Sequence, residues 1–86
     1  MAVFIISYDL RKPDYNYQPL YDALAEWGAK RVQDSVWGLR TDASAEQVFD
    51  DLWNHVHNEK DRLFVVTFDK EQNYKAQNSI NQLKSI

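Results

Sequence analysis

Few side chains in this sequence have the type and spacing that catalysis or metal binding requires. Cysteine is absent, which excludes disulfide scaffolds, thiolate zinc sites and cysteine nucleophiles. His55 and His57 are two positions apart on an expected helix, so they point in different directions and cannot chelate one ion together. Ser35 has no histidine or lysine base at an informative spacing, and a turn is its more common setting. A serine nucleophile is therefore disfavoured.

Asp9 directly follows an apolar run, and its carboxylate is the next candidate for chemistry. An aspartate after a strand commonly caps a turn or pairs with a nearby cation, here Arg11. Aromatic side chains are frequent around it, at 14% of the chain, and in a small domain such rings are most often core or interface anchors. Base stacking is the alternative role for Tyr8, Tyr15, Tyr17, Trp27, Trp37 and Trp53.

The elements that must position these residues belong to one domain over residues 1–86, because a second core would need roughly another 50 residues. The composition, with 44% hydrophobic and 27% charged residues, is typical of a soluble globular protein. A net charge of −3 argues against coating long nucleic acid by charge alone. The apolar run 3–6 is interrupted by polar residues and lacks a basic leader, so we expect a cytoplasmic protein without a membrane partner.

Hydrophobic patterning predicts six elements and a tail. Branched and aromatic residues indicate strands at 2–9 and 62–69, and two short strands within 29–41 that are broken near Asp34-Ser35. Helical spacing indicates a helix at about 17–27, with Pro19 in its first turn and Gly28 after its end. A second helix is expected at about 44–57, where Ser44 and Gln47 match a capping box. The tail has weak helical spacing and favours a short, fraying helix.

The predicted order is strand, helix, two strands, helix, strand, which is the α+β ferredoxin-like βαββαβ arrangement. Two helices cover one face of an antiparallel sheet, yet the strands at 2–9 and 62–69 are apolar on both faces. The second face therefore needs a cover, and the candidates are the C-terminal tail and a second copy of the sheet. We expect a homodimer on this ground.

The tract Arg31-Val32-Gln33-Asp34-Ser35-Val36-Trp37 resembles the Arg-hydrophobic-Gln-X-Ser-Val-aromatic signature of the CRISPR-associated protein 2 family. Ser7-Tyr8-Asp9 is similar to the aromatic-Asp pair of that family, and Gly28 precedes the tract. The likeness covers residues 2–69. It implies a dimer in which two aspartates face each other and hold a divalent cation, and members that are either metal-dependent endonucleases or structural partners of the CRISPR integrase.

Carried onto this sequence, the resemblance makes Asp9 the ligand of Mg²⁺ or Mn²⁺ and a catalytic residue. Arg31 and Ser35 are the other catalytic residues that the resemblance implies. Arg31 would face phosphate, although shielding of an edge strand is its alternative role, and Ser35 would lie near the scissile group or the interface. Nucleic-acid contacts are expected from Tyr8, Arg11, Lys12, Arg31 and Trp37.

The function expected from this resemblance is metal-dependent endonuclease activity in antiviral defence, with RNA preferred over DNA. The alternative is a non-catalytic dimeric adaptor, either an integrase partner or a regulator of the toxin–antitoxin type. The sequence departs from the family where the helix at 17–27 carries no lysine or arginine and where Asp34 fills the variable position of the signature. The missing basic residues and the acidity of the chain favour the adaptor, and the small acidic chain resembles stand-alone relatives of the family.

Overall fold

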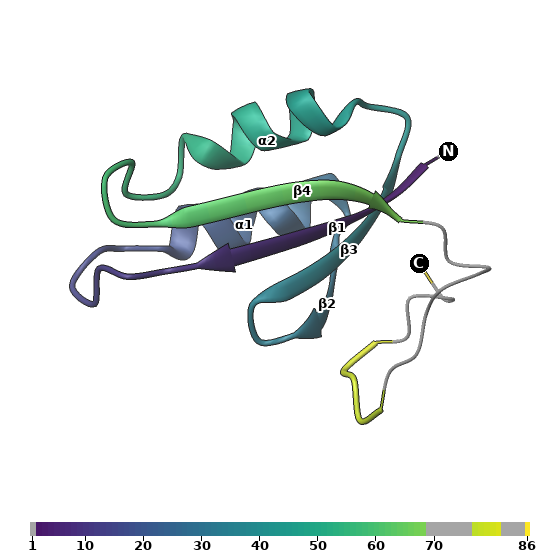
Figure 1. The fold of residues 1–86 in the computed structure, drawn as a ribbon, viewed down its shortest axis with the longest axis horizontal. Coiled ribbons are helices and arrows are strands. Elements are labelled where there is room, and N and C mark those ends of the chain that lie inside the picture. The colour runs from purple at the N-terminus through teal and green to yellow at the C-terminus, as the bar shows by residue number, and fades with distance from the viewer. Residues whose placement is uncertain (1, 69–76, 82–85) are drawn as a thin grey trace.

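The protein folds as a four-stranded antiparallel sheet with two helices, in a computed structural model that describes residues 2–68, 77–81 and 86 (Figure 1). The elements are β1 (Ala2–Asp9), α1 (Gln18–Trp27), β2 (Lys30–Gln33), β3 (Val36–Thr41), α2 (Ala45–Trp53) and β4 (Arg62–Phe68). The strand order is β2-β3-β1-β4. Element order and topology confirm the ferredoxin-like α+β fold predicted from the sequence.

Local signals fix both ends of α1 and the start of α2 where the sequence predicted them. Pro19 lies in the first turn of α1, and Gly28 ends that helix in the left-handed conformation, with φ at 85°. Ser44 caps α2: its Oγ accepts the Gln47 backbone N–H at 3.1 Å, and the Gln47 Oε1 accepts the Ser44 N–H at 2.8 Å. The chain also turns at Asp34-Ser35, between β2 and β3, as expected.

The predicted extent of the second helix is wrong, because α2 ends at Trp53 and not near residue 57. The Asn54 and His55 N–H groups already bond three residues back, to Asp51 and Leu52. The His57 N–H then donates to the side chain of Asp61, so these residues form a loop. The short helix expected in the tail, residues 70–86, falls largely on 70–76 and 82–85, which lie outside the described residues. Residue 69, the last of the predicted strand 62–69, also lies outside them.

Both helices pack on one face of the sheet, and the main core lies between them. In Figure 1, α1 lies behind the strands. The fully buried side chains of this core are Ile6, Leu20, Leu24, Leu39, Val48 and Leu52. Each contributes roughly 1.5–3 kcal/mol through burial. No helix among the described residues is long or apolar enough to cross a membrane.

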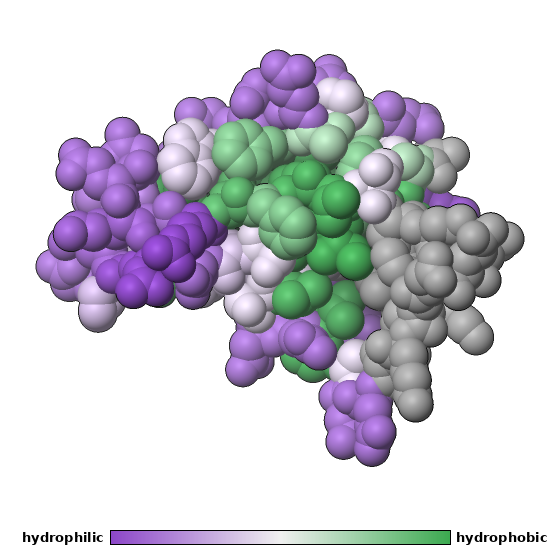
Figure 2. Space-filling view, viewed as in Figure 1, coloured by the Kyte–Doolittle hydropathy of each residue, from purple (hydrophilic) through white to green (hydrophobic). Residues whose placement is uncertain are grey.

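The opposite face of the sheet is only partly covered, and we call it the open face. Ile86 packs there with Val3 and Val32, and the Ile80 N–H donates to the Val32 carbonyl at 2.8 Å, so the tail reaches β2. On β4, the side chains of Phe64 and Val66 stay 55% and 40% exposed. Figure 2 shows apolar surface gathered over the middle of this side of the molecule.

Candidate functional site

Asp9 ends β1 on the open face and is flanked by two arginines. The β1–β4 register pairs Asp9 with Arg62, and the Arg62 Nη1 donates to Asp9 Oδ2 at 3.2 Å. The Arg11 Nη1 lies 3.7 Å from the same oxygen. All three side chains are more than half exposed. We call these residues the Asp9 cluster; its Arg11–Asp9 pair is the simpler of the roles expected for Asp9.

The donors of the Asp9 cluster do not suit a divalent cation within one chain. Mg²⁺ and Mn²⁺ require several oxygen ligands and favour an excess of negative charge. Asp9 supplies one carboxylate, and the two guanidinium groups give the cluster a net charge of +1. Among residues 2–68, 77–81 and 86, no group of three or more His, Asp or Glu side chains could hold a metal ion.

A shallow depression brings Asp9 and Ser35 to the same part of the surface. Its lining consists of Ser7, Tyr8, Asp9, Ser35, Arg62, Leu63 and Phe64. Ser35 is exposed and is tied to β1 through its carbonyl, which accepts the Tyr8 backbone N–H at 3.2 Å. The depression therefore joins the Asp9 cluster to the exposed apolar side chain of Phe64.

Arg31 and Trp37 lie on the helix face of the sheet, opposite to Asp9. Arg31 pairs with Trp37 across β2 and β3, and its guanidinium carbon lies 4.8 Å from the Trp37 ring and 5.6 Å from the Tyr21 ring. Such contacts are cation–π interactions. The structure therefore does not bring Arg31 together with Asp9, although both belong to the predicted site.

Tyr8 shares this aromatic group on the helix face. Its hydroxyl accepts the Trp37 Nε1–H at 2.9 Å and donates to the Asp34 carbonyl at 3.2 Å. Burial raises the pKa of the Tyr8 hydroxyl, and the hydrogen bond from Trp37 opposes that shift. Tyr8 thus links the turn at Asp34 to β1.

Lys12 belongs to the loop that follows β1 and is engaged within that loop. Its Nζ lies 2.9 Å from Asp14 Oδ1, and this hydrogen bond lowers the pKa of the Asp14 carboxyl. Its backbone N–H donates to the Tyr17 hydroxyl at 3.2 Å. Arg11, one residue earlier, is the member of this basic pair that reaches Asp9.

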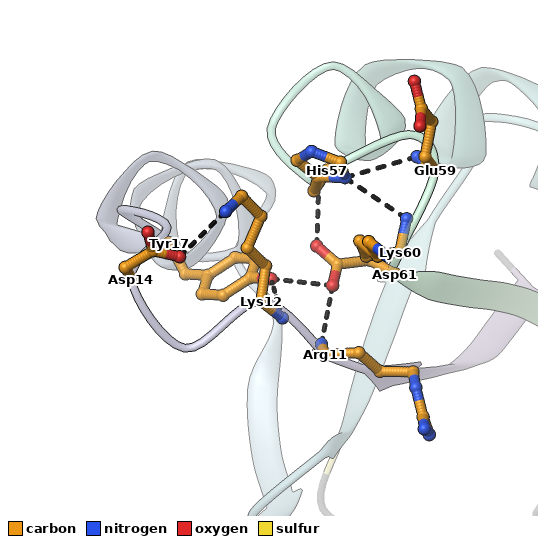
Figure 3. Close-up of polar contacts among 8 residues, drawn as sticks. All are labelled: Arg11, Lys12, Asp14, Tyr17, His57, Glu59, Lys60 and Asp61. Carbon is orange, nitrogen blue, oxygen red and sulfur yellow. Dashed lines mark hydrogen bonds and ion pairs between the residues drawn. The ribbon is translucent and has the colours of Figure 1, made fainter.

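Sequence reasoning missed Asp61, the buried charged residue in the described part of the chain, which is 6% exposed. Its carboxylate accepts three hydrogen bonds: from the Arg11 backbone N–H at 2.7 Å, the Tyr17 hydroxyl at 2.7 Å and the His57 backbone N–H at 2.8 Å. Figure 3 shows Asp61 between the loop after β1 and the loop after α2. Asp61 therefore fixes the backbone from which Arg11 extends.

The hydrogen bonds at Asp61 determine how this group titrates. Burial by itself raises the pKa of the Asp61 carboxyl, but the bonds from Arg11, Tyr17 and His57 outweigh burial and hold its pKa below the usual value. Partial burial, together with donation of its hydroxyl to Asp61, raises the pKa of Tyr17 to about 12. Both residues are thus stabilised in the protonation states of neutral pH.

Alkaline pH is expected to weaken the fold through Tyr17. Its pKa rises on folding from 10.0 to about 12, so its contribution to stability is fully present below pH 10 and is lost as the pH rises through about 12. We expect the stability difference between the wild type and Tyr17→Phe to shrink over this range. Urea unfolding of both proteins at a series of pH values measures it. Parallel stability curves would contradict the assignment.

Residues 1–76 match the family described as CRISPR associated protein Cas2. The matched range contains all six elements, the Asp9 cluster and the Asp61 hydrogen bonds that position it.

Proposed function

This chain belongs to the CRISPR associated protein Cas2 family, and from that membership we propose that it acts as a homodimer that holds nucleic acid at its Asp9 clusters. The observation that carries the proposal is the position of the cluster beside the exposed apolar side chains of the open face. Ser7 pairs with Phe64, and Asp9 pairs with Arg62, in the same β1–β4 ladder.

A second copy of the chain is the occupant proposed for the open face. Phe64 and Val66 are exposed on β4. Ile5, which pairs with Val66, and Val36, on the far side of β1, are only partly buried. Pairing of two open faces about a twofold axis would remove this apolar surface from water. Both Asp9 clusters would then flank the interface, and one strand of nucleic acid could contact both.

Arginine is the side chain best suited to hold the phosphates. Its planar guanidinium donates two parallel hydrogen bonds to a phosphate and keeps its charge at every physiological pH. Each cluster has two positive charges, on Arg11 and Arg62, and one negative charge, on Asp9. It is therefore cationic, although the whole chain carries a net charge of −3. Binding would be local, with a small dependence on salt.

Holding nucleic acid without cleaving it is the role that the charges of the site support best. Arg62, at 3.2 Å, and Arg11, at 3.7 Å, already balance the negative charge of Asp9. A catalytic metal ion would need that negative charge to bind. A structural subunit of this kind would work with a protein partner, such as the CRISPR integrase or a toxin.

Metal-dependent endonuclease activity, with RNA as the preferred substrate, is the second candidate. The exposed position of Asp9 in a depression that also contains Ser35 favours it, because a substrate phosphate could reach both side chains. The two carboxylates of a dimer would have to share Mg²⁺ or Mn²⁺ and release their arginines.

Labelled RNA and DNA, incubated with the purified protein in magnesium, manganese or chelator, distinguish the two candidates. We expect binding without cleavage. Replacing both Arg11 and Arg62 with glutamine should weaken binding. The slope of log affinity against log salt concentration should also become shallower by about 1 for each lost phosphate contact. Asp9→Asn should bind as well as the wild type or better, because it removes a negative charge beside the phosphate.

Arg40→Gln is the matched control, since Arg40 is exposed on β3 and pairs with Val3 at the other end of β1. Unchanged binding by the double arginine variant would overturn the proposed site. Cleavage that requires a metal ion and disappears in Asp9→Asn would replace the structural role with the endonuclease.

A further inference from the structure

A second depression lies where α2 ends. It shares no lining residue with the depression that contains Asp9 and Ser35. It has a volume of about 360 Å³, within the range of small-ligand sites. Three aromatic rings and two side-chain amides contribute to its lining, which consists of Tyr15, Trp53, Asn54, Val56, His57 and Asn58. The residues come from the loop after β1, the end of α2 and the loop that follows it.

Two of the rings are held in place by contacts that do not involve a ligand. Tyr15 and His57 meet edge to face, with ring centroids 5.6 Å apart and planes at 88°. The Tyr15 hydroxyl donates to the Val56 carbonyl at 3.4 Å. The His57 Nδ1 accepts the Lys60 N–H at 3.2 Å and the Glu59 N–H at 3.4 Å. Walls that are fixed in advance reduce the cost of binding.

The polar groups of the depression offer both donors and acceptors. Because Nδ1 of His57 accepts backbone N–H groups, the hydrogen of the neutral ring lies on Nε2. Asn54 and Asn58 are exposed, and each side-chain amide supplies an N–H₂ donor and a carbonyl acceptor. A flat ligand with alternating donors and acceptors on its edge matches this set.

We propose that this depression binds one unpaired nucleobase, with the aromatic rings contacting the base and the Asn54 and Asn58 amides contacting its hydrogen-bonding edge. Stacking on aromatic side chains and readout of exposed base edges are how proteins bind single strands. The inference rests on the proposed function and deepens it, because it names single-stranded nucleic acid as the substrate class.

The position of the depression relative to the Asp9 cluster supports this assignment. The Asp61 carboxylate accepts the backbone N–H of His57, in the wall of the depression, and that of Arg11, in the cluster. In Figure 3, His57 and the Arg11 side chain extend on different sides of Asp61. The wall of the depression and the backbone that carries Arg11 are therefore fixed by the same carboxylate.

Three ligands of equal length test the proposal against the full-length protein: a single-stranded oligonucleotide, the same backbone without bases, and a duplex. NMR signals of the Trp53 indole N–H and of the Asn54 and Asn58 side-chain amides report the site directly. We expect the base-containing single strand to bind about tenfold more tightly than either control and to shift these signals. The variant with both Asn54→Ala and Asn58→Ala should show a smaller preference, because the aromatic rings still contact the base but its hydrogen-bonding edge has lost both amides.

Gln33→Ala is the matched control, because Gln33 is an exposed amide on β2, at the far edge of the sheet from β4. Equal affinity for the single strand and the base-free backbone would overturn the pocket while leaving the proposed function intact. If the wild-type protein binds none of the three ligands, the proposed function is overturned. Free nucleosides, titrated on the same NMR signals, would then decide the pocket alone.

Discussion

Replacement of Asp61 with alanine is expected to lower the free energy of unfolding by about 3 kcal/mol. The change leaves the Arg11 N–H, the His57 N–H and the Tyr17 hydroxyl without the acceptor that each now has at 2.7–2.8 Å. Unsatisfied buried donors cost about 1–3 kcal/mol each, and water entering the loops recovers part of that cost. Domains have only about 0.05–0.15 kcal/mol of stability per residue, so the loss is a large fraction of the total.

Asp9→Ala is the matched control for this prediction. Asp9 has two cationic partners, yet its side chain is 57% exposed, and exposed ion pairs contribute only about 0–1 kcal/mol. Urea unfolding at neutral pH measures both variants. Asp61→Asn should fall between them, because its amide keeps one oxygen acceptor and places an N–H₂ group against a donor. Equal losses in Asp61→Ala and Asp9→Ala would contradict the role assigned to the buried carboxylate.

The features that could be predicted from the sequence are those decided by neighbouring residues. The strands follow from runs of branched and aromatic residues, and the ends of α1 follow from Pro19 and Gly28. The start of α2 follows from Ser44 and Gln47, which are three positions apart and bond to each other in the structure. Such signals act within one turn of the chain, so a single sequence is enough to find them.

The features that could not be predicted depend on contacts between distant segments. Asp61 precedes a strand and resembles any turn residue, and only its bonds to Arg11 and Tyr17, 50 and 44 positions away, reveal its role. Arg31 fits the family signature, but the face on which it lies depends on the pairing of β2 with β3. The early end of α2 is a local exception, because the Asp61 side chain that accepts the His57 N–H lies only four positions along the chain.

A charge at position 64 is expected to dissociate the proposed dimer. Phe64 is 55% exposed on β4, and burial of such a ring contributes roughly 1.5–3 kcal/mol. In a twofold interface each substitution occurs twice, so Phe64→Asp should cost about 3–6 kcal/mol. Since 1.4 kcal/mol corresponds to tenfold, the dissociation constant should rise by about 10² to 10⁴. Sedimentation equilibrium over a range of protein concentrations measures this change.

Thr67→Asp separates loss of the interface from general damage to β4. Thr67 is exposed on the same strand but pairs with Phe4, so its side chain lies on the helix face, and its charge would leave the open face unchanged. We expect Thr67→Asp to remain dimeric and Phe64→Asp to become a folded monomer that binds nucleic acid more weakly, because it presents one Asp9 cluster in place of two. A wild-type protein that is monomeric at every concentration would remove the dimer from the proposal. A Phe64→Asp protein that dimerises as tightly as Thr67→Asp would place the interface away from the open face, and the two clusters would then have no reason to act on one strand.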